Sequence, residues 1–229
     1  MKRNLILAIV LLGTSVATLC ASAGTIVDRI VATVNGQIIL QSDWDDAIRY
    51  HALVDDQALN AVSADERKAA LDHLIDQELL KEQMSADDFQ QSSDEEIARE
   101  IRDIRKRYPG CEADEKWDEV LDRYGLNEQT LKRSVGKQLN LMRLVDEHLR
   151  PTVNIDTHSI ESYYNQELLP QLRQSGAGEV PLAEVTPKIK ELLTQQKVNE
   201  LLVAWLHNLR SSSDIRTEPG TLSAGENAQ

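Results

Sequence analysis

The sequence has 229 residues and a formal net charge of −13 at pH 7, from 38 acidic and 25 basic side chains. Nucleic acids and anionic membrane surfaces repel a chain this acidic, so the composition argues against both as partners. Hydrophobic residues make up 41% of the chain, and Leu, Ile, Val and Ala recur at helical spacings. This pattern excludes a disordered chain and is sufficient for one or two domains with a buried core.

The first residues have the layout of a secretory signal. Two basic residues precede an apolar run over 5–12, and smaller residues follow. Ala21 and Ala23 form the small-x-small ending that signal peptidase requires. We therefore predict a signal peptide over 1–23, with cleavage before Gly24 and export to the periplasm.

Two other readings of this segment remain open. The first is an uncleaved N-terminal anchor, although the apolar run is shorter than the roughly 20 residues that span a bilayer. The second is a lipid-bearing Cys20, which the bulky Leu19 before it disfavours. Cleavage would leave 23 basic and 38 acidic residues, a net charge of −15, and no stable membrane insertion.

Cleavage would also leave Cys111 as the single cysteine, which excludes an internal disulfide. Pro109 and Gly110 precede it, and acidic residues follow. These neighbours favour an incidental loop cysteine over a catalytic nucleophile.

After the signal segment, the sequence predicts one β-hairpin followed by a series of helices. Asn35-Gly36 lies between two runs rich in Val and Ile, which predicts strands over 29–34 and 37–40. Three helices are predicted to open with a capping box, in which a serine and an acidic residue three positions later cap each other's backbone, at Ser42 with Asp45, Ser63 with Glu66, and Ser93 with Glu96. The fold class is mainly α.

Two longer helices follow. Periodic apolar residues predict one over 127–149, and Asp156 is placed to cap a short helix after it. The composition of 174–181 indicates a linker, and a final helix is predicted over 182–209. Its apolar stripe is too broad to face water, so it needs a groove or a partner. Residues 217–229 are predicted to be a disordered tail.

No catalytic pattern stands out. The five histidines lie apart from other metal ligands at the required spacings, at His51, His73, His148, His158 and His207. The sequence has no glycine-rich phosphate loop and no hydrolase or metalloprotease motif. The basic run at Arg102, Arg105, Lys106 and Arg107 is interpreted as a solvated helix face, and Trp44, Trp117 and Trp205 as core residues, with an exposed client groove as the alternative for a tryptophan. We predict no catalytic residue, metal or cofactor, and no enzyme.

Five segments, taken in order, resemble SurA-type periplasmic chaperones. They are DRIVATVNGQIILQSD at 28–43, AALDHLIDQELL at 69–80, YGLNEQTL at 124–131, VNID at 153–156 with Ile160 and Tyr163-Tyr164, and the helix and strand within 189–215. In that family one or two parvulin-type prolyl isomerase domains follow the Tyr-Tyr segment. Here 16 residues separate Tyr164 from Pro181, whereas such a domain needs on the order of 100, so the isomerase is missing.

The resemblance implies a helical chaperone core with a short N-terminal hairpin. An N-terminal domain over 24–173 would be completed by a helix and strand over 182–216, with Ile215 close to a strand that pairs with the hairpin. It also implies an ATP-independent periplasmic chaperone that holds unfolded outer-membrane or other envelope proteins in transit. Client-binding residues stay unassigned. The alternatives are a non-catalytic binding protein for one dedicated folded partner, and a homodimeric adaptor.

Overall fold

The computed structural model describes residues 28–83, 91–111 and 113–218. The predicted signal peptide, with Ala21 and Ala23, lies outside these residues, as does the predicted tail from residue 219 onward.

The N-terminal hairpin forms as expected from its turn. Strands β1 (Ile30–Val34) and β2 (Gln37–Leu40) are antiparallel, and Asn35 and Gly36 take φ angles of 49° and 88° between them. Two successive positive φ angles define the tight hairpin turn that Asn-Gly favours. The C-terminal strand β3 (Ile215–Thr217) pairs antiparallel with the other side of β1, which gives the sheet order β2-β1-β3. The expected pairing of the Ile215 strand with the hairpin is therefore confirmed, and Thr217 belongs to this strand rather than to the tail.

The side chain of Asn35 joins the turn to two distant segments. Its amide Nδ2 donates to Glu82 Oε2 at 2.6 Å and to Ser213 Oγ at 3.2 Å, and its Oδ1 accepts from the backbone N–H of Asp214 at 2.9 Å. One turn residue thus fixes the end of the second helix and the start of β3 against the hairpin.

Helix α1 (Gln41–Val54) begins two residues earlier than a cap at Ser42 would place it. Ser42 lies inside the helix, so the predicted Ser42–Asp45 capping box is wrong. Asp43 instead accepts from the backbone N–H of Leu40 at 3.4 Å, and Asp28 accepts from the backbone N–H of Ser42 at 3.2 Å and from its hydroxyl. A carboxylate from before the sheet therefore does the capping, since it satisfies a free N–H of the first turn.

The other two capping boxes are present. Helix α2 (Ala64–Glu82) follows the 3₁₀ turn Leu59–Ala61, and helix α3 is Asp94–Arg105. The backbone N–H of Ser63 donates to Glu66 at 2.7 Å, and that of Ser93 donates to Glu96 at 2.8 Å. These bonds hold the pKa of both glutamates below the ordinary value.

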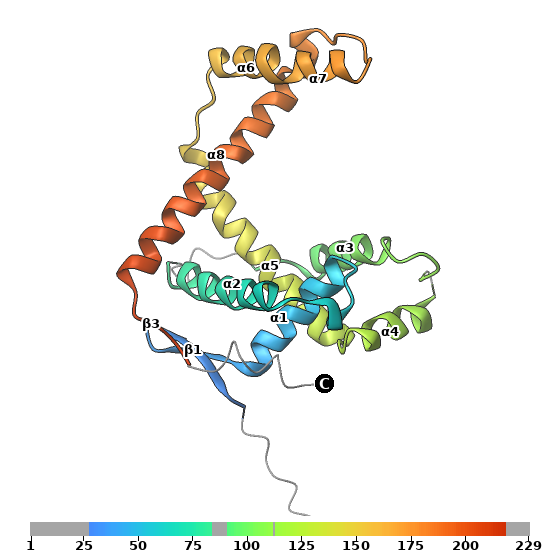
Figure 1. Ribbon diagram of the computed structural model, residues 1–229, viewed down its shortest axis with the longest axis vertical. Helices are drawn as coiled ribbons and strands as arrows, with labels where there is room; N and C mark the ends of the chain where they lie inside the picture. Colours follow the sequence, from blue (N-terminus) through green and yellow to red (C-terminus); the bar gives the residue numbers. More distant parts are fainter. Residues whose placement is uncertain (1–27, 84–90, 112, 219–229) are drawn as a thin grey trace, which may run out of the picture.

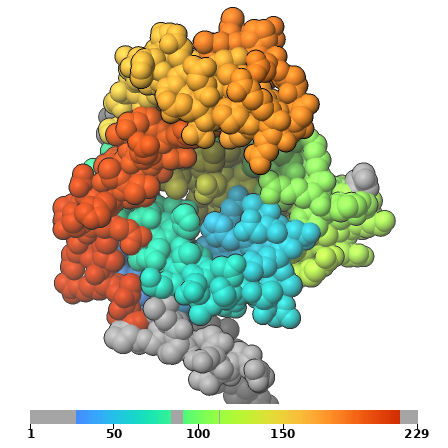
Figure 2. All heavy atoms as spheres, turned by 45° about the horizontal axis from the view of Figure 1, so that its top comes forward, coloured from blue at the N-terminus to red at the C-terminus, as the bar shows by residue number. Residues whose placement is uncertain are grey.

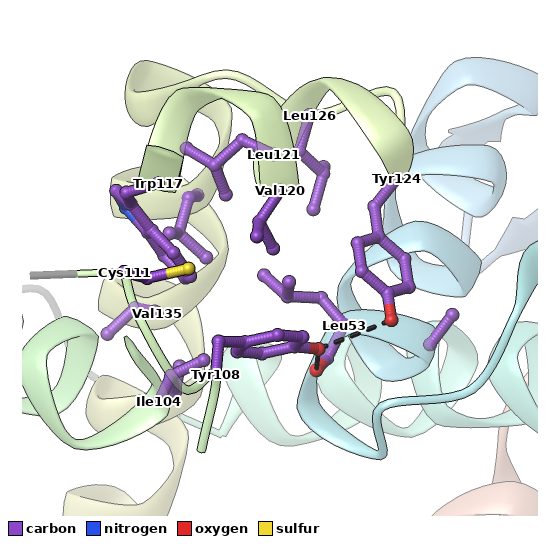
Figure 3. Close-up of a cluster of buried hydrophobic side chains, with 12 residues drawn as sticks. Leu53, Ile104, Tyr108, Cys111, Trp117, Val120, Leu121, Tyr124, Leu126 and Val135 are labelled. Carbon is purple, nitrogen blue, oxygen red and sulfur yellow. Dashed lines mark hydrogen bonds between the residues drawn. The ribbon is translucent and has the colours of Figure 1, made fainter. Parts of the chain in front are cut away.

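Helices α4 (Asp114–Arg123) and α5 (Glu128–Leu149) complete the first core with α3 and the end of α1. Figure 3 shows this cluster, in which the hydroxyls of Tyr108 and Tyr124 point toward each other near Leu53. The Tyr108 hydroxyl donates to the carbonyl of Leu53 and lies 3.3 Å from the Tyr124 hydroxyl. Burial raises the pKa of Tyr108, so its hydroxyl acts as a neutral hydrogen-bonding group.

The second half of the chain extends away from this body (Figure 1). After the 3₁₀ turn Arg150–Thr152, the chain forms α6 (Thr157–Tyr163), the π-helical turn η4 (Tyr164–Leu168) and α7 (Leu169–Gln174). Helix α8 (Leu182–Ser212) then runs from this distal unit back to the sheet, passing α5 and α2. Asp156 caps α6, with its Oδ1 accepting from the N–H of Ser159 at 2.7 Å. The predicted linker from residue 174 begins at the last residue of α7, and no isomerase domain lies between Tyr164 and Pro181.

Candidate functional site

A groove between α2, α5 and α8 forms a hollow with a volume of about 710 Å³. Figure 2 shows the hollow with α8 along one side, α1 and α2 along another, and α5 at its base. Its apolar lining comes from all three helices, through Leu80, Leu141, Met142, Val145, Val198, Leu202 and Leu206. A hollow of this size and lining can accept several apolar side chains of a partner.

The floor of the groove rests on a small core. Leu80, Val145, Leu149 and Val198 are buried there, and the surrounding apolar side chains of α5 and α8 are only partly buried. Where α5 meets α8, the ring of His148 stacks on Trp205, with ring centroids 4.6 Å apart. The apolar side chains at the α5–α8 junction therefore pack together but are not fully buried.

Apolar side chains are also exposed along the groove. Met142, on α5, lines it with 58% of its surface exposed, and Val203 and Leu192, on α8, are 69% and 41% exposed. Leu192 and Val203 lie on the side of α8 next to Asn199, which lines the groove, because residues three, four and seven apart share a helix face. Exposed apolar side chains beside a hollow are typical of a surface that binds another chain.

Two arginines hold α8 in place at the two ends of the groove. Arg210, on α8, donates from Nε to Asp76 Oδ1 at 2.6 Å and from Nη2 to the carbonyl of Asp72 at 2.9 Å. Arg150, at the end of α5, donates to Asp146 at 2.6 Å and to Glu191 on α8 at 3.0 Å. Ion pairs with Asp76 and Asp146 raise the pKa of these arginines further, so both clamps stay charged at every accessible pH.

A second hollow of about 370 Å³ lies between β2, α2 and α5. It shares Gln77 and Leu141 with the groove, so the two hollows are neighbours. Two ion pairs lie on its rim, Lys81 with Glu78 at 3.0 Å and Lys137 with Asp43 at 4.0 Å.

The wall between α1 and α2 carries the one close histidine pair. His51 and His73 have ring centroids 5.7 Å apart, and both line the groove as well as a smaller pocket of about 160 Å³. Burial, with the neighbouring His73, holds the pKa of His51 below its ordinary value, and Asp55 opposes this shift. His51 is therefore neutral at pH 7 and adds no positive charge to the groove.

The other residues that the sequence singled out have structural roles. Trp44 and Trp117 are buried, and Trp205 is partly buried at the α5–α8 junction. Cys111 is in the loop after α3, and its side chain is buried in the first core. Three residues of the basic run have partners in the same chain: Arg105 with Asp114 at 2.9 Å, Lys106 with Asp103 at 2.6 Å, and Arg107 with the carbonyl of Val54 at 2.7 Å.

Within the part of the chain that the structure describes, no group of three or more His, Cys, Asp or Glu side chains is placed to hold a metal ion. No helix over 28–83, 91–111 and 113–218 combines the length and hydropathy needed to cross a bilayer.

The groove residues were not identified from the sequence. The breadth of the apolar stripe on the final helix indicated that a groove exists, but a stripe does not say which of its side chains stay uncovered. The apolar periodicity of the helix over 127–149 placed Met142 in its buried stripe, and this prediction is wrong, because Met142 is 58% exposed on the groove wall.

The comparison with protein families agrees with this architecture. The SurA-like N-terminal domain family matches residues 2–145, which include the hairpin and most of α5, whereas the distal unit, α8 and β3 lie beyond the match. No curated protein sequence matches the chain significantly. Because the match covers more than half of the sequence, the chain belongs to the SurA-like N-terminal domain family, and this membership supports a chaperone-like role that includes binding unfolded protein segments.

Proposed function

We propose that the protein is an ATP-independent periplasmic chaperone that holds unfolded outer-membrane or other envelope proteins in transit. The observation that carries this proposal is the open apolar groove between α2, α5 and α8, with Met142 exposed on its wall. Burying apolar client side chains there gains free energy in proportion to the area removed from water. Ordering a flexible client costs much of that gain, so each contact is weak and release needs no fuel.

The proposal includes export through the predicted signal and function without catalysis or cofactor. Its basis is the layout of residues 1–23 and the absence of a catalytic motif from the sequence. Fractionation of expressing cells, followed by mass measurement of the exported form, checks the location and the expected cleavage before Gly24.

The direct test is aggregation of a denatured outer-membrane porin diluted into buffer. We expect the chain from Gly24 onward to suppress light scattering at near-stoichiometric amounts without ATP. Failure to suppress, with circular dichroism showing a folded protein, would reject the holding function and favour one dedicated folded partner. A pull-down from an envelope extract would then identify that partner.

A pair of variants locates the activity. Met142→Glu puts a charge on the apolar wall and should weaken holding several-fold, because a client must then desolvate a carboxylate. Ile30→Glu makes the same kind of change at an exposed position (39%) outside the groove. Equal loss in the two variants would show that the groove is not the binding surface.

A further inference from the structure

The cations around the groove are already engaged by acceptors of the same chain. Arg150 donates to Asp146, to Glu191 and, at 3.3 Å, to Gln195. Arg143, which also lines the groove, donates to Glu96 at 2.6 Å. An acidic client segment entering the groove would have to displace one of these carboxylates, or lie beside them without a counter-charge.

One anion of the lining has no such partner. Glu147 is exposed, lines the groove, and its side chain makes no ion pair or hydrogen bond with any residue within 28–83, 91–111 and 113–218. It lies on α5, five residues after the exposed Met142 and next to Asp146. A client cation can therefore pair with Glu147 while an adjacent apolar side chain enters the groove.

The charge of the whole chain also favours a basic client over an acidic one, and the other groups of the groove do not oppose it. The carboxylates of Asp76 and Asp146 also line the groove, but they are paired with Arg210 and Arg150, and His51 is neutral at pH 7. These groups therefore do not offset the charge of Glu147. The whole chain carries a net charge of −13. Charges of one sign around a concave, partly apolar surface raise the local concentration of partners of the opposite sign.

We infer that the groove selects apolar client segments that carry lysine or arginine over otherwise identical segments that carry aspartate or glutamate. This inference rests on the proposed holding function and specifies its client chemistry. The apolar side chains supply the binding area, and a basic side chain of the client pairs with Glu147 at the rim.

The test uses three fluorescent peptides with the same alternating apolar residues and with Lys, Gln or Glu at every polar position. Binding to the chain from Gly24 onward is measured by anisotropy at low and at high salt. We expect the Lys peptide to bind about five-fold more tightly than the Glu peptide at low salt, because each exposed pair contributes little. The ratio should fall toward one at about 0.3 M salt, where screening is strong.

Two variants separate a local effect from the general charge of the protein. Glu147→Gln should reduce the Lys-to-Glu affinity ratio about two-fold. Glu119→Gln, which removes the same charge from an exposed position on α4 outside the groove, should leave the ratio almost unchanged.

The outcomes are distinguishable. Equal binding of all three peptides would overturn the inference and leave the holding function standing, as would an equal effect of the two variants. Absence of binding by any of the peptides, together with no suppression of porin aggregation, would overturn both.

Discussion

The two halves of helix α5 pack into cores that differ in how completely their side chains are buried. Its first half packs with α3, α4 and the end of α1 into a cluster of twelve buried side chains, joined by the Tyr108 and Tyr124 hydroxyls (Figure 3). Its second half meets α8 over four buried side chains, and most of the remaining apolar contacts there are only partly buried. One helix thus belongs both to a closed core that fixes the fold and to an open junction that keeps apolar surface available for binding.

Removal of α8 and β3 should destabilise the protein more than any other change. Ending the chain before Pro181 uncovers Leu80, Val145 and Leu149 and leaves β1 without its β3 partner. We expect the truncated protein to aggregate and to lose cooperative thermal unfolding. Light scattering and calorimetry measure this.

A shorter truncation is the control. Removing only 219–229 should leave the unfolding transition where it is in the full chain, because the composition of this segment predicts a disordered tail. A soluble, cooperatively folding protein that ends at residue 180 would show that α8 is not needed to complete the core.

Two single substitutions distinguish the two cores, since one should mainly affect stability and the other mainly client holding. Leu121, in the first core, is 1% exposed, and Leu121→Ala should cost about 3 kcal/mol of unfolding free energy through the cavity it leaves. Leu202 is partly buried on the groove wall, and Leu202→Ala should cost only about 1 kcal/mol. Urea unfolding measures both.

Client holding should respond in the opposite order. The Leu202 variant removes groove surface and should hold porin less well, whereas the Leu121 variant, tested where it remains folded, should hold it normally. If Leu121→Ala impairs holding more than Leu202→Ala does at equal folded fraction, the two regions do not divide stability and binding as described.

The ion pairs of Arg210 attach α8 to α2, and their removal should change the stability only modestly. Arg210→Gln removes the ion pairs to Asp72 and Asp76 that hold α8 on α2, and should cost about 1 kcal/mol in urea unfolding. Arg173→Gln breaks an exposed pair with Glu179 in the distal unit and is the matched control, with an expected cost below about 0.5 kcal/mol. Indistinguishable costs would mean that the clamp contributes no more than a surface ion pair.

Much of the fold follows from local chemistry that the sequence displays. Asn35-Gly36 determines the hairpin, and the capping serines Ser63 and Ser93 place the starts of α2 and α3. The start of α1 could not be found in this way, because its capping carboxylate is Asp28, fourteen residues before the capped N–H. Local rules fail where a partner comes from another part of the chain.

The residues that line the groove could not be predicted from local sequence rules either. Apolar periodicity on α5 and α8 predicted buried stripes, but the exposed fraction of Met142 or Val203 depends on where three helices cross. The free carboxylate of Glu147 is likewise visible only after the partners of Arg143 and Arg150 are known. Sequence therefore indicated that a surface must be covered, and tertiary packing decides which part is left open.

The smallest expected effect concerns pH and the histidine wall between α1 and α2. Burial holds the pKa of His51 below its ordinary value of 6.5, so the unfolded chain binds a proton more readily than the folded one. Stability from this group is complete above pH 6.5 and decreases as the pH falls below it. The urea midpoint should therefore drop between pH 7.5 and 5.5 by more in the natural protein than in His51→Gln. His158→Gln, at an exposed position on α6, should follow the natural protein. Parallel pH profiles for the natural protein and His51→Gln would contradict the prediction. A steeper decrease in the natural protein would show that protonation of His51 loosens the groove wall, since the charge arises 5.7 Å from the ring of His73.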